Sequence, residues 1–400
     1  MSNVAGVVAP GWEPVRDAFA ANFGTTEEVG AGAAVYHRGV RVVDLWGGSF
    51  DAEGITPYGE DTLQLVFSTT KGITAIALAM CVERGLIGYD DPVAKHWPEF
   101  AAHGKPDATV AQLVSHQCGL YTVDGPITLE EALDWPTVTA RLADTAPRWP
   151  IGAKHGYHAL TYGWLAGELV RRVDPGERSL GTFVREEIVE PLGAELWIGL
   201  PEHLEPRVSR MLAAPPVADP AMAALAAQFM GPGTPAGDAL SLNGAFGGIG
   251  QPLAAGDMAF NLPAVHAAEI PAANCITNAR SLARVYAATM APVDGVQLVG
   301  DKTREVARTT VTPEGEPDAC LLMNTTFGMG FMTHGPFTPY AGPGSYGHPG
   351  AGGSVAFAQP ERELACAYVM NQMAGNLAGD MRAQAIIDAA AACADRAVVG

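Results

Sequence analysis

Hydrophobic and polar residues follow two different periods along this chain, and the period changes between its ends and its middle. Residues 11–23 carry apolar side chains at helical spacing. Residues 33–47 instead form two strand-like runs on either side of a turn at Arg38-Gly39. We therefore expect an N-terminal helix followed by a β-hairpin that forms the outer strands of a sheet.

The middle of the chain is dominated by helical patterns. They run from residue 128 to 230, with clear examples at 129–142 and 162–172. Residues 231–262 are rich in glycine and proline and predict a long irregular loop. Such a loop serves either as a wall or lid of a binding site or as a plain connection. A further helix is expected over 278–290, with Thr277 as its cap.

Strand-like patterns return in the last third, over 327–333, 354–358 and 364–371, before an alanine-rich helix at 380–392. This order predicts an α/β (α+β) fold with an antiparallel sheet built from both termini and flanked by helices. We expect residues 1–66 and 285–400 to form one discontinuous α/β domain. Residues 67–284 would form a mostly helical domain, with the active site in the cleft between the two.

Composition narrows the class of protein. The chain has 400 residues, 48% hydrophobic and 17% charged, which is typical of a folded globular enzyme. A net charge of -19 argues against nucleic acid or an anionic membrane as partner. The six cysteines are scattered and predict buried thiols. No basic leader or long apolar run is evident, so we expect a cytoplasmic protein.

Candidate chemistry is densest where a β-like run, 63–67, meets an apolar helical run, 72–82. The junction is a Ser-x-x-Lys motif that begins at Ser68 and ends at Lys71. A serine three residues before a lysine at a helix start places both side chains on one face. Serine is a weak nucleophile that must hand its proton to a base within hydrogen-bonding reach. The spacing therefore predicts a serine nucleophile with an amine as its base.

A lysine serves as a base only where burial or a neighbouring cation lowers its pKa from about 10.4. Lys71 leads into a run too apolar for a surface helix, so we expect its amine to be partly buried. It is also the only lysine of the chain with a serine three residues before it. The alternative is a motif that arose by chance on a solvated helix.

Two further segments carry groups that would complete such a site. Tyr157 lies in a loop before a helical run, and a tyrosine can relay a proton when a nearby cation stabilises its phenolate. Taken alone, Tyr157 is more typical of a packing aromatic. Pro349 marks an edge in a strand that opens near residue 346. If Pro349 faces a cleft, the N–H of Ala351 faces it too, and with the N–H of Ser68 it would form an oxyanion hole.

The sequence gives little support for a metal site, a nucleotide site or an α/β-hydrolase site. His155 and His158 are three residues apart, but no third metal ligand is evident. Residues 342–347 match G-x-G-x-x-G without the strand before and the helix after that a nucleotide site needs. No G-x-S-x-G motif is present, which argues against an ordinary α/β-hydrolase. We expect neither a metal nor a cofactor.

In this combination and order, the motifs resemble those of the serine β-lactamase-like superfamily. Its members carry Ser-x-x-Lys, then Tyr-x-Asn or a variant, then Lys-Thr-Gly or His/Trp-x-Gly. The corresponding residues here are Ser68 to Lys71, Tyr157-His158-Ala159 and His348-Pro349-Gly350. The likeness spans most of the chain and is strongest to class C β-lactamases and family VIII-type carboxylesterases. It implies a β-lactamase/transpeptidase-like fold.

The resemblance also implies roles for these residues. Ser68 would be the acylated nucleophile and Lys71 its base. Tyr157 would share the base role and protonate the leaving group. The N–H groups of Ser68 and Ala351 would hold the oxyanion. The residues expected to contact the substrate are His348, Gly350 and His158.

Two departures from the family pattern bear on the substrate. Ala159 stands where a β-lactamase usually has an asparagine that holds the amide of the drug. His348 replaces a lysine that would attract the carboxylate of the drug. Both changes weaken recognition of β-lactams and leave acyl transfer intact. We therefore expect a carboxylesterase acting on small or short-acyl esters through an acyl-enzyme.

Several alternatives stay open at this point. Within the same fold they are a β-lactamase, a hydrolase of D-aminopeptides or amides, and an acyltransferase to an alcohol. From a different class, the chain could be a non-catalytic binding protein that kept the fold. The expected partner is a small ester, and the sequence does not set the oligomeric state.

Overall fold

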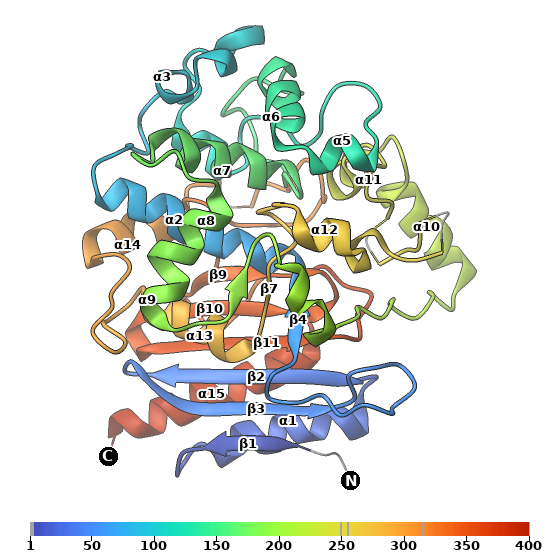
Figure 1. Ribbon diagram of the computed structural model, residues 1–400, viewed down its shortest axis with the longest axis vertical. Coiled ribbons are helices and arrows are strands. Elements are labelled where there is room, and N and C mark those ends of the chain that lie inside the picture. The colour runs from blue at the N-terminus through green and yellow to red at the C-terminus, as the bar shows by residue number, and fades with distance from the viewer. Residues whose placement is uncertain (1–3, 249, 254–255, 314, 400) are drawn as a thin grey trace.

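The computed structural model describes residues 4–248, 250–253, 256–313 and 315–399. A large antiparallel sheet lies at one end of the molecule, and a lobe made mostly of helices lies at the other (Figure 1). The architecture is the expected antiparallel sheet flanked by helices.

Within the described residues, the large sheet has seven strands in the order β1-β3-β2-β11-β10-β9-β8. The strands are β1 (Ala5–Val8), β2 (Gly30–His37), β3 (Val40–Gly48), β8 (Met332–Thr333), β9 (Tyr346–Pro349), β10 (Val355–Gln359) and β11 (Leu364–Met370). The N-terminal and C-terminal parts join where β2 pairs with β11, with Tyr36 opposite Ala365. The expectation of a sheet built from both termini is confirmed.

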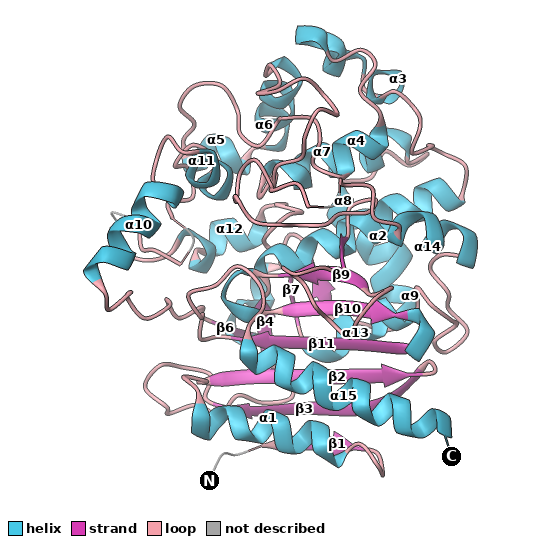
Figure 2. Ribbon diagram, turned by 180° about the vertical axis from the view of Figure 1, so that it is seen from behind, coloured by secondary structure: helices cyan, strands magenta, loops and turns pink. Residues whose placement is uncertain are grey.

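Helices cover both faces of this sheet. Helices α1 (Glu13–Thr25) and α15 (Met381–Val399) pack together on one face (Figure 2). Helix α13 (Ala279–Ala287) packs on the other face against β2, β10 and β11. It straddles the expected domain boundary at residue 284, and its contacts make it part of the sheet lobe.

The remaining helices form the lobe beyond β9, where α2 contacts β9 directly (Figure 1). They are α2 (Thr70–Glu83), α3 (Val93–His96), α4 (Val110–Val114), α5 (Leu129–Leu133), α6 (Trp135–Asp144), α7 (Thr161–Val173), α8 (Leu180–Val184), α9 (Glu190–Leu192), α10 (Pro220–Met230), α11 (Pro235–Ser241), α12 (Pro263–Ala267) and α14 (Asp301–Arg308). Short 3₁₀ or π segments are η1 (Phe67–Thr69), η2 (Pro98–Gly104), η3 (Arg185–Val189), η4 (Glu202–Arg207), η5 (Ala259–Asn261), η6 (Ala351–Gly353) and η7 (Pro360–Arg362).

A small sheet joins distant parts of this lobe in the order β5-β7-β4-β6. Its strands are β4 (Leu63–Leu65), β5 (Leu196–Trp197), β6 (Val208–Ser209) and β7 (Ile276–Thr277). Strand β4 leads directly into the turn before α2, so this sheet fixes where α2 begins. Within the residues that the structure describes, no helix has both the length and the apolar character that crossing a bilayer requires.

Local sequence explains several elements. Arg38 and Gly39 have φ angles of 53° and 73°, as a two-residue hairpin turn requires, and the predicted hairpin is confirmed. The predicted helix over 129–142 is split, because the Asp134 side chain accepts a hydrogen bond from Thr137 N and starts α6 anew.

Three predictions about the later part of the chain were wrong in detail. Residues 231–262 are not irregular throughout, since Thr234 caps helix α11; residues 249, 254 and 255 lie outside the described residues. The cap of α13 is Asn278, whose side chain accepts from Ser281 N, while Thr277 belongs to β7. Of the strand expected over 327–333, only β8 forms.

Candidate active site

Ser68 lies in η1, the single turn between β4 and α2. It is partly exposed, whereas every other residue from 62 to 81 is buried. Phe67, directly before it, has a φ of 42°, a left-handed conformation that costs a non-glycine residue about 1–3 kcal/mol. The strained turn therefore presents one hydroxyl at the surface of an otherwise closed core.

Hydrogen bonds from distant segments hold this turn in place. Ser354 Oγ donates to Val66 O at 2.8 Å and lies 3.1 Å from Thr69 Oγ1. On the other side, Thr70 Oγ1 accepts from Cys275 N at 2.9 Å. The turn is thus bonded both to the sheet lobe and to the small sheet, which fixes Ser68 between them.

Lys71 lies in the first turn of α2 with its side chain fully buried. Its Nζ is 2.9 Å from Ser68 Oγ. Nζ also donates to the carbonyl oxygens of Ala159 at 2.6 Å and Ala272 at 2.9 Å. Within the described residues no carboxylate lies within ion-pair distance of Lys71. A buried ammonium without a counter-charge is costly.

Burial lowers the pKa of Lys71 well below its usual range. The neutral amine has two N–H donors and one lone pair. With the two N–H groups donated to Ala159 and Ala272, the lone pair is left for the Ser68 hydroxyl. The three contacts of Nζ therefore match a neutral amine that accepts the proton of Ser68, which is the arrangement a serine nucleophile needs.

Neither carbonyl was expected from the sequence, because a main-chain oxygen leaves no signal in side-chain types. The one from Ala159 comes from the loop before α7, and the one from Ala272 from the segment before β7. The two reach Lys71 only through the packing of these segments around α2.

Tyr157 lies on the loop before α7, as expected, and it is buried. Its ring centroid is 4.9 Å from Lys71 Nζ. Burial raises the pKa of the phenol, although the nearby Ser68 hydroxyl opposes this. Tyr157 therefore begins as a proton donor beside the serine oxygen, and the fold brings these three predicted side chains together.

The end of β9 passes close to the Ser68 turn. A Cβ on Gly350 would lie 2.2 Å from Ser354 Oγ and 2.3 Å from Val66 O, so only glycine fits there. Among the described residues, the N–H groups of Ser68 and Ala351 donate to no acceptor outside their own helical turns. Strand β8 pairs with β9 only at Tyr346 and Gly347, which leaves the last half of β9 at the sheet edge, as the proline predicted.

His348 is buried, and its ring stacks on Tyr157 at a centroid distance of 5.9 Å. Nδ1 donates to Pro349 O at 2.7 Å, which leaves Nε2 as a bare acceptor with no partner among the described residues. Burial, and then the nearby Lys71, lower the pKa of His348 well below its usual range. This side chain is neutral and cannot supply the positive charge of the lysine that it replaces.

His158 holds the main chain rather than facing outward. Nδ1 donates to Gly156 O at 2.5 Å and Nε2 accepts from Leu120 N at 2.8 Å, so both ring nitrogens are occupied. Its own N–H donates to His116 Nδ1 at 3.1 Å. Burial lowers the pKa of His158 to about 4. The ring thus offers no free nitrogen to a substrate, unlike the substrate contact expected from the sequence.

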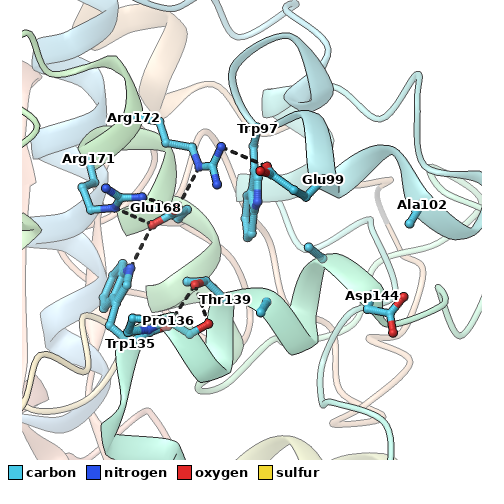
Figure 3. A pocket seen from close by; sticks show the side chains of 12 residues that line it. Trp97, Glu99, Ala102, Trp135, Pro136, Thr139, Asp144, Glu168, Arg171 and Arg172 are labelled. Atoms are coloured by element: carbon cyan, nitrogen blue, oxygen red, sulfur yellow. Dashed lines mark hydrogen bonds and ion pairs between the residues drawn. The ribbon is translucent and has the colours of Figure 1, made fainter.

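A metal site does not emerge from these histidines. Within the described residues, no group of three or more His, Cys, Asp or Glu side chains is arranged to hold a metal ion. A hollow elsewhere in the helical lobe is lined by Trp97, Trp135 and residues of α6 and α7 (Figure 3). It includes none of the predicted catalytic or substrate-contacting residues.

Comparisons with known proteins cover nearly the whole chain. The β-lactamase family model matches residues 15–391. The esterase/β-lactamase LipL of Mycobacterium tuberculosis (strain ATCC 25618 / H37Rv) is 35% identical over 376 residues, 92% of this chain and 83% of LipL.

Two solved structures are also similar over their full length. A family VIII carboxylesterase is 36% identical, with a TM-score of 0.85 over 98% of this chain and 100% of the other. A novel penicillin-binding protein homolog from Caulobacter crescentus is 37% identical, with the same TM-score of 0.85 and the same coverage of 98% and 100%. The family model and these relatives cover nearly the whole chain, and the chain belongs to the β-lactamase family.

Proposed function

We propose that this protein is a carboxylesterase that cleaves small or short-acyl esters through an acyl-enzyme on Ser68. The observation that carries the proposal is the buried Lys71 amine, 2.9 Å from Ser68 Oγ and without a carboxylate partner among the described residues. The esterase and the family VIII carboxylesterase found among its relatives confirm the broader expectation of a serine ester hydrolase on this fold.

Acylation follows from the three side chains. The Lys71 amine takes the proton of Ser68 as Oγ bonds to the ester carbonyl carbon. The N–H groups of Ser68 and Ala351 stabilise the negative charge that develops on the carbonyl oxygen. Tyr157 then donates its proton to the departing alkoxide as the ester C–O bond breaks. The Lys71 ammonium returns its proton to the phenolate.

Deacylation repeats the same steps with water. Tyr157 and Lys71 together take a proton from a water molecule, whose oxygen attacks the acyl carbon. The bond to Ser68 Oγ breaks, and the proton passes back to the serine. An alcohol in place of water would give acyl transfer to that alcohol by the same route.

The surroundings of the site favour a neutral substrate. His348 carries no charge, so it would not attract a carboxylate. Ala159 supplies its main-chain carbonyl to Lys71 and has no side-chain amide for a drug or peptide. Both features support a small ester over a β-lactam or a D-aminopeptide.

The direct test is hydrolysis of p-nitrophenyl acetate and butyrate by the wild type and by Ser68→Ala. We expect turnover with a burst of p-nitrophenol in the wild type. Ser68→Ala should remain folded and lose both, because the bond to the acyl group can no longer form. Wild-type protein without burst or turnover would leave a non-catalytic binding protein as the better description.

A second candidate activity is hydrolysis of β-lactams. It is favoured by two relatives, one named esterase/β-lactamase and the other a penicillin-binding protein homolog. Nitrocefin hydrolysis faster than ester hydrolysis would reverse our ranking. Added alcohols that divert the acyl group from water would instead reveal an acyltransferase.

We also propose a cytoplasmic location. All six cysteines are free and buried, which supports a compartment that keeps thiols reduced. Fractionation of cells followed by detection of the protein tests this proposal, and recovery outside the cytoplasm would contradict it.

A further inference from the structure

Asp318 is a buried carboxylate that the mechanism above does not use. Its side chain is fully buried, and among the described residues its oxygens meet N–H groups and a hydroxyl, with no lysine, arginine or histidine at ion-pair distance. Buried carboxylates of this kind are costly unless several donors satisfy them. The hydrogen-bond partners of Asp318 therefore indicate its role.

One oxygen of Asp318 binds the main chain of Tyr157. Oδ1 accepts hydrogen bonds from the N–H of Tyr157 at 3.0 Å, Cys320 at 2.8 Å and Leu321 at 2.9 Å. The last two bonds close a tight turn in its own loop. The first reaches across to the loop that carries the catalytic phenol, 161 residues away in the sequence.

The other oxygen reaches the same loop through a relay. Oδ2 accepts from Thr325 Oγ1 at 2.9 Å, and since this hydroxyl donates to the carboxylate, it accepts from His155 Nε2 at 3.1 Å. A main-chain bond from Ala319 N to His155 O, 2.9 Å long, lies beside them. Three hydrogen bonds thus connect residues 318–325 to residues 155–157.

The loop at residues 155–157 also packs closely against its neighbours. A Cβ on Gly156 would lie 3.0 Å from Cys320 Sγ and 2.6 Å from the Trp149 ring, so the two loops approach each other more closely than a side chain would allow. The Tyr157 main chain therefore has little freedom to move relative to Asp318.

We propose that Asp318 is a positioning residue of the reaction, which holds the main chain of Tyr157 so that its phenol stays beside Lys71 and Ser68. This inference rests on the esterase function proposed above. The bond from Tyr157 N to Asp318 Oδ1 fixes the main chain that carries the phenol. A fixed main chain keeps the Tyr157 hydroxyl where it can donate a proton to the leaving alcohol.

The test compares two esters that share an acyl group and differ in leaving group. p-Nitrophenolate departs without a proton, whereas the ethoxide of ethyl butyrate needs one from a general acid. If Asp318 acts through Tyr157, its loss should reduce kcat/KM for ethyl butyrate more than for p-nitrophenyl butyrate. A residue that only stabilises the fold would reduce both equally.

The main variant is Asp318→Asn, whose neutral oxygen accepts the three N–H bonds more weakly than a carboxylate and whose amide N–H₂ group cannot accept from Thr325 Oγ1. We expect the ratio of kcat/KM, p-nitrophenyl over ethyl, to rise by about tenfold, a part of the ~10²–10⁴ that a general acid supplies. Thr325→Val, which retains the charge and removes the relay to His155, should raise the ratio by a smaller factor. If Asp318→Asn does not fold, Thr325→Val tests the inference in its place.

The matched control is Glu269→Gln. Glu269 also accepts a hydroxyl, from Ser179 at 2.6 Å, and a main-chain N–H, from Gly181 at 3.0 Å, but it lies away from Tyr157. Its ratio should equal that of the wild type. An unchanged ratio in folded Asp318→Asn, or in Thr325→Val if only that variant folds, overturns the inference. A wild type inactive on both esters overturns the proposed function instead.

Discussion

Two buried groups of the helical lobe handle charge in opposite ways. Glu168, on α7, is 2% exposed and accepts hydrogen bonds from Trp135, Arg171 and Arg172 at 2.7–2.8 Å (Figure 3). Lys71, at the start of α2, is also buried, but within the part of the chain that the structure describes it meets only carbonyl oxygens and the Ser68 hydroxyl. The described residues thus surround Glu168 with counter-charges and provide none for Lys71.

The difference separates a structural charge from a reactive group. Burial opposes ionisation of Glu168, but hydrogen bonds from Arg171, Trp135 and Arg172 outweigh it and hold its pKa below the usual value. For Lys71, burial lowers the pKa of the amine, and hydrogen bonds from ionised groups do not offset this effect. A paired ion stabilises the fold at neutral pH, whereas an unpaired buried amine stays neutral and can accept a proton.

The largest expected effect comes from Lys71→Met. Methionine fills a similar volume without an amine, so Ser68 loses its base and kcat/KM for p-nitrophenyl butyrate should fall by about 10⁴-fold or more. Stability should stay the same or rise, because a buried polar group is removed. Steady-state kinetics and urea unfolding check both. A variant that is active, or strongly destabilised, would place Lys71 with Glu168 among the structural residues.

Tyr157→Phe should have the next largest effect. It keeps the ring that packs on Lys71 and His348 and removes the hydroxyl, so kcat should fall by ~10²–10⁴-fold while the fold is retained. Parallel measurement of kcat and KM shows whether the loss lies in the chemical step. Activity within twofold of the wild type would mean that Tyr157 is only a packing aromatic.

The pH profile sharpens the same contrast. The reaction needs neutral Lys71, so kcat/KM should fall about tenfold per pH unit below the lowered pKa of this amine and stay level above it. Between that lowered pKa and about 10.4, Lys71 is protonated in the unfolded chain and neutral in the folded protein. The free energy of unfolding therefore rises with pH over this range, because unfolding takes up a proton. Activity that increases toward acid pH contradicts a lysine base.

Glu168→Gln should give the smallest change in activity and a clear change in stability. Both arginines are partly exposed, so we expect a loss of about 1–3 kcal/mol of unfolding free energy with kcat/KM unchanged. In the wild type this contribution is present above the carboxyl pKa of the unfolded chain and is lost as pH falls through the lowered folded value. Urea unfolding at several pH values measures it, and a tenfold drop in activity would link this cluster to the site.

How far the sequence could predict the site depends on the distance between partners. Ser68 and Lys71 lie within one helical turn, so their spacing alone places them together. Tyr157 was singled out from its loop and from likeness to a family, and the structure places its ring beside Lys71. Gly350, assigned by that likeness, lies against the Ser68 turn at Val66 O, and the role of the Ala351 N–H stays a prediction. His158 was expected at the substrate, but its neighbours in space, Gly156 O and Leu120 N, decide that it supports the main chain.

The sequence by itself determined the α+β order of the elements, the hairpin at Arg38-Gly39 and the serine–lysine pair, because each depends on local periodicity or on neighbours along the chain. Only the tertiary structure decided that the Lys71 amine meets no counter-ion among the described residues and that Asp318 reaches the main chain of Tyr157. Solvation and long-range pairing depend on which segments pack together in space, and a pattern of residue types does not contain that information.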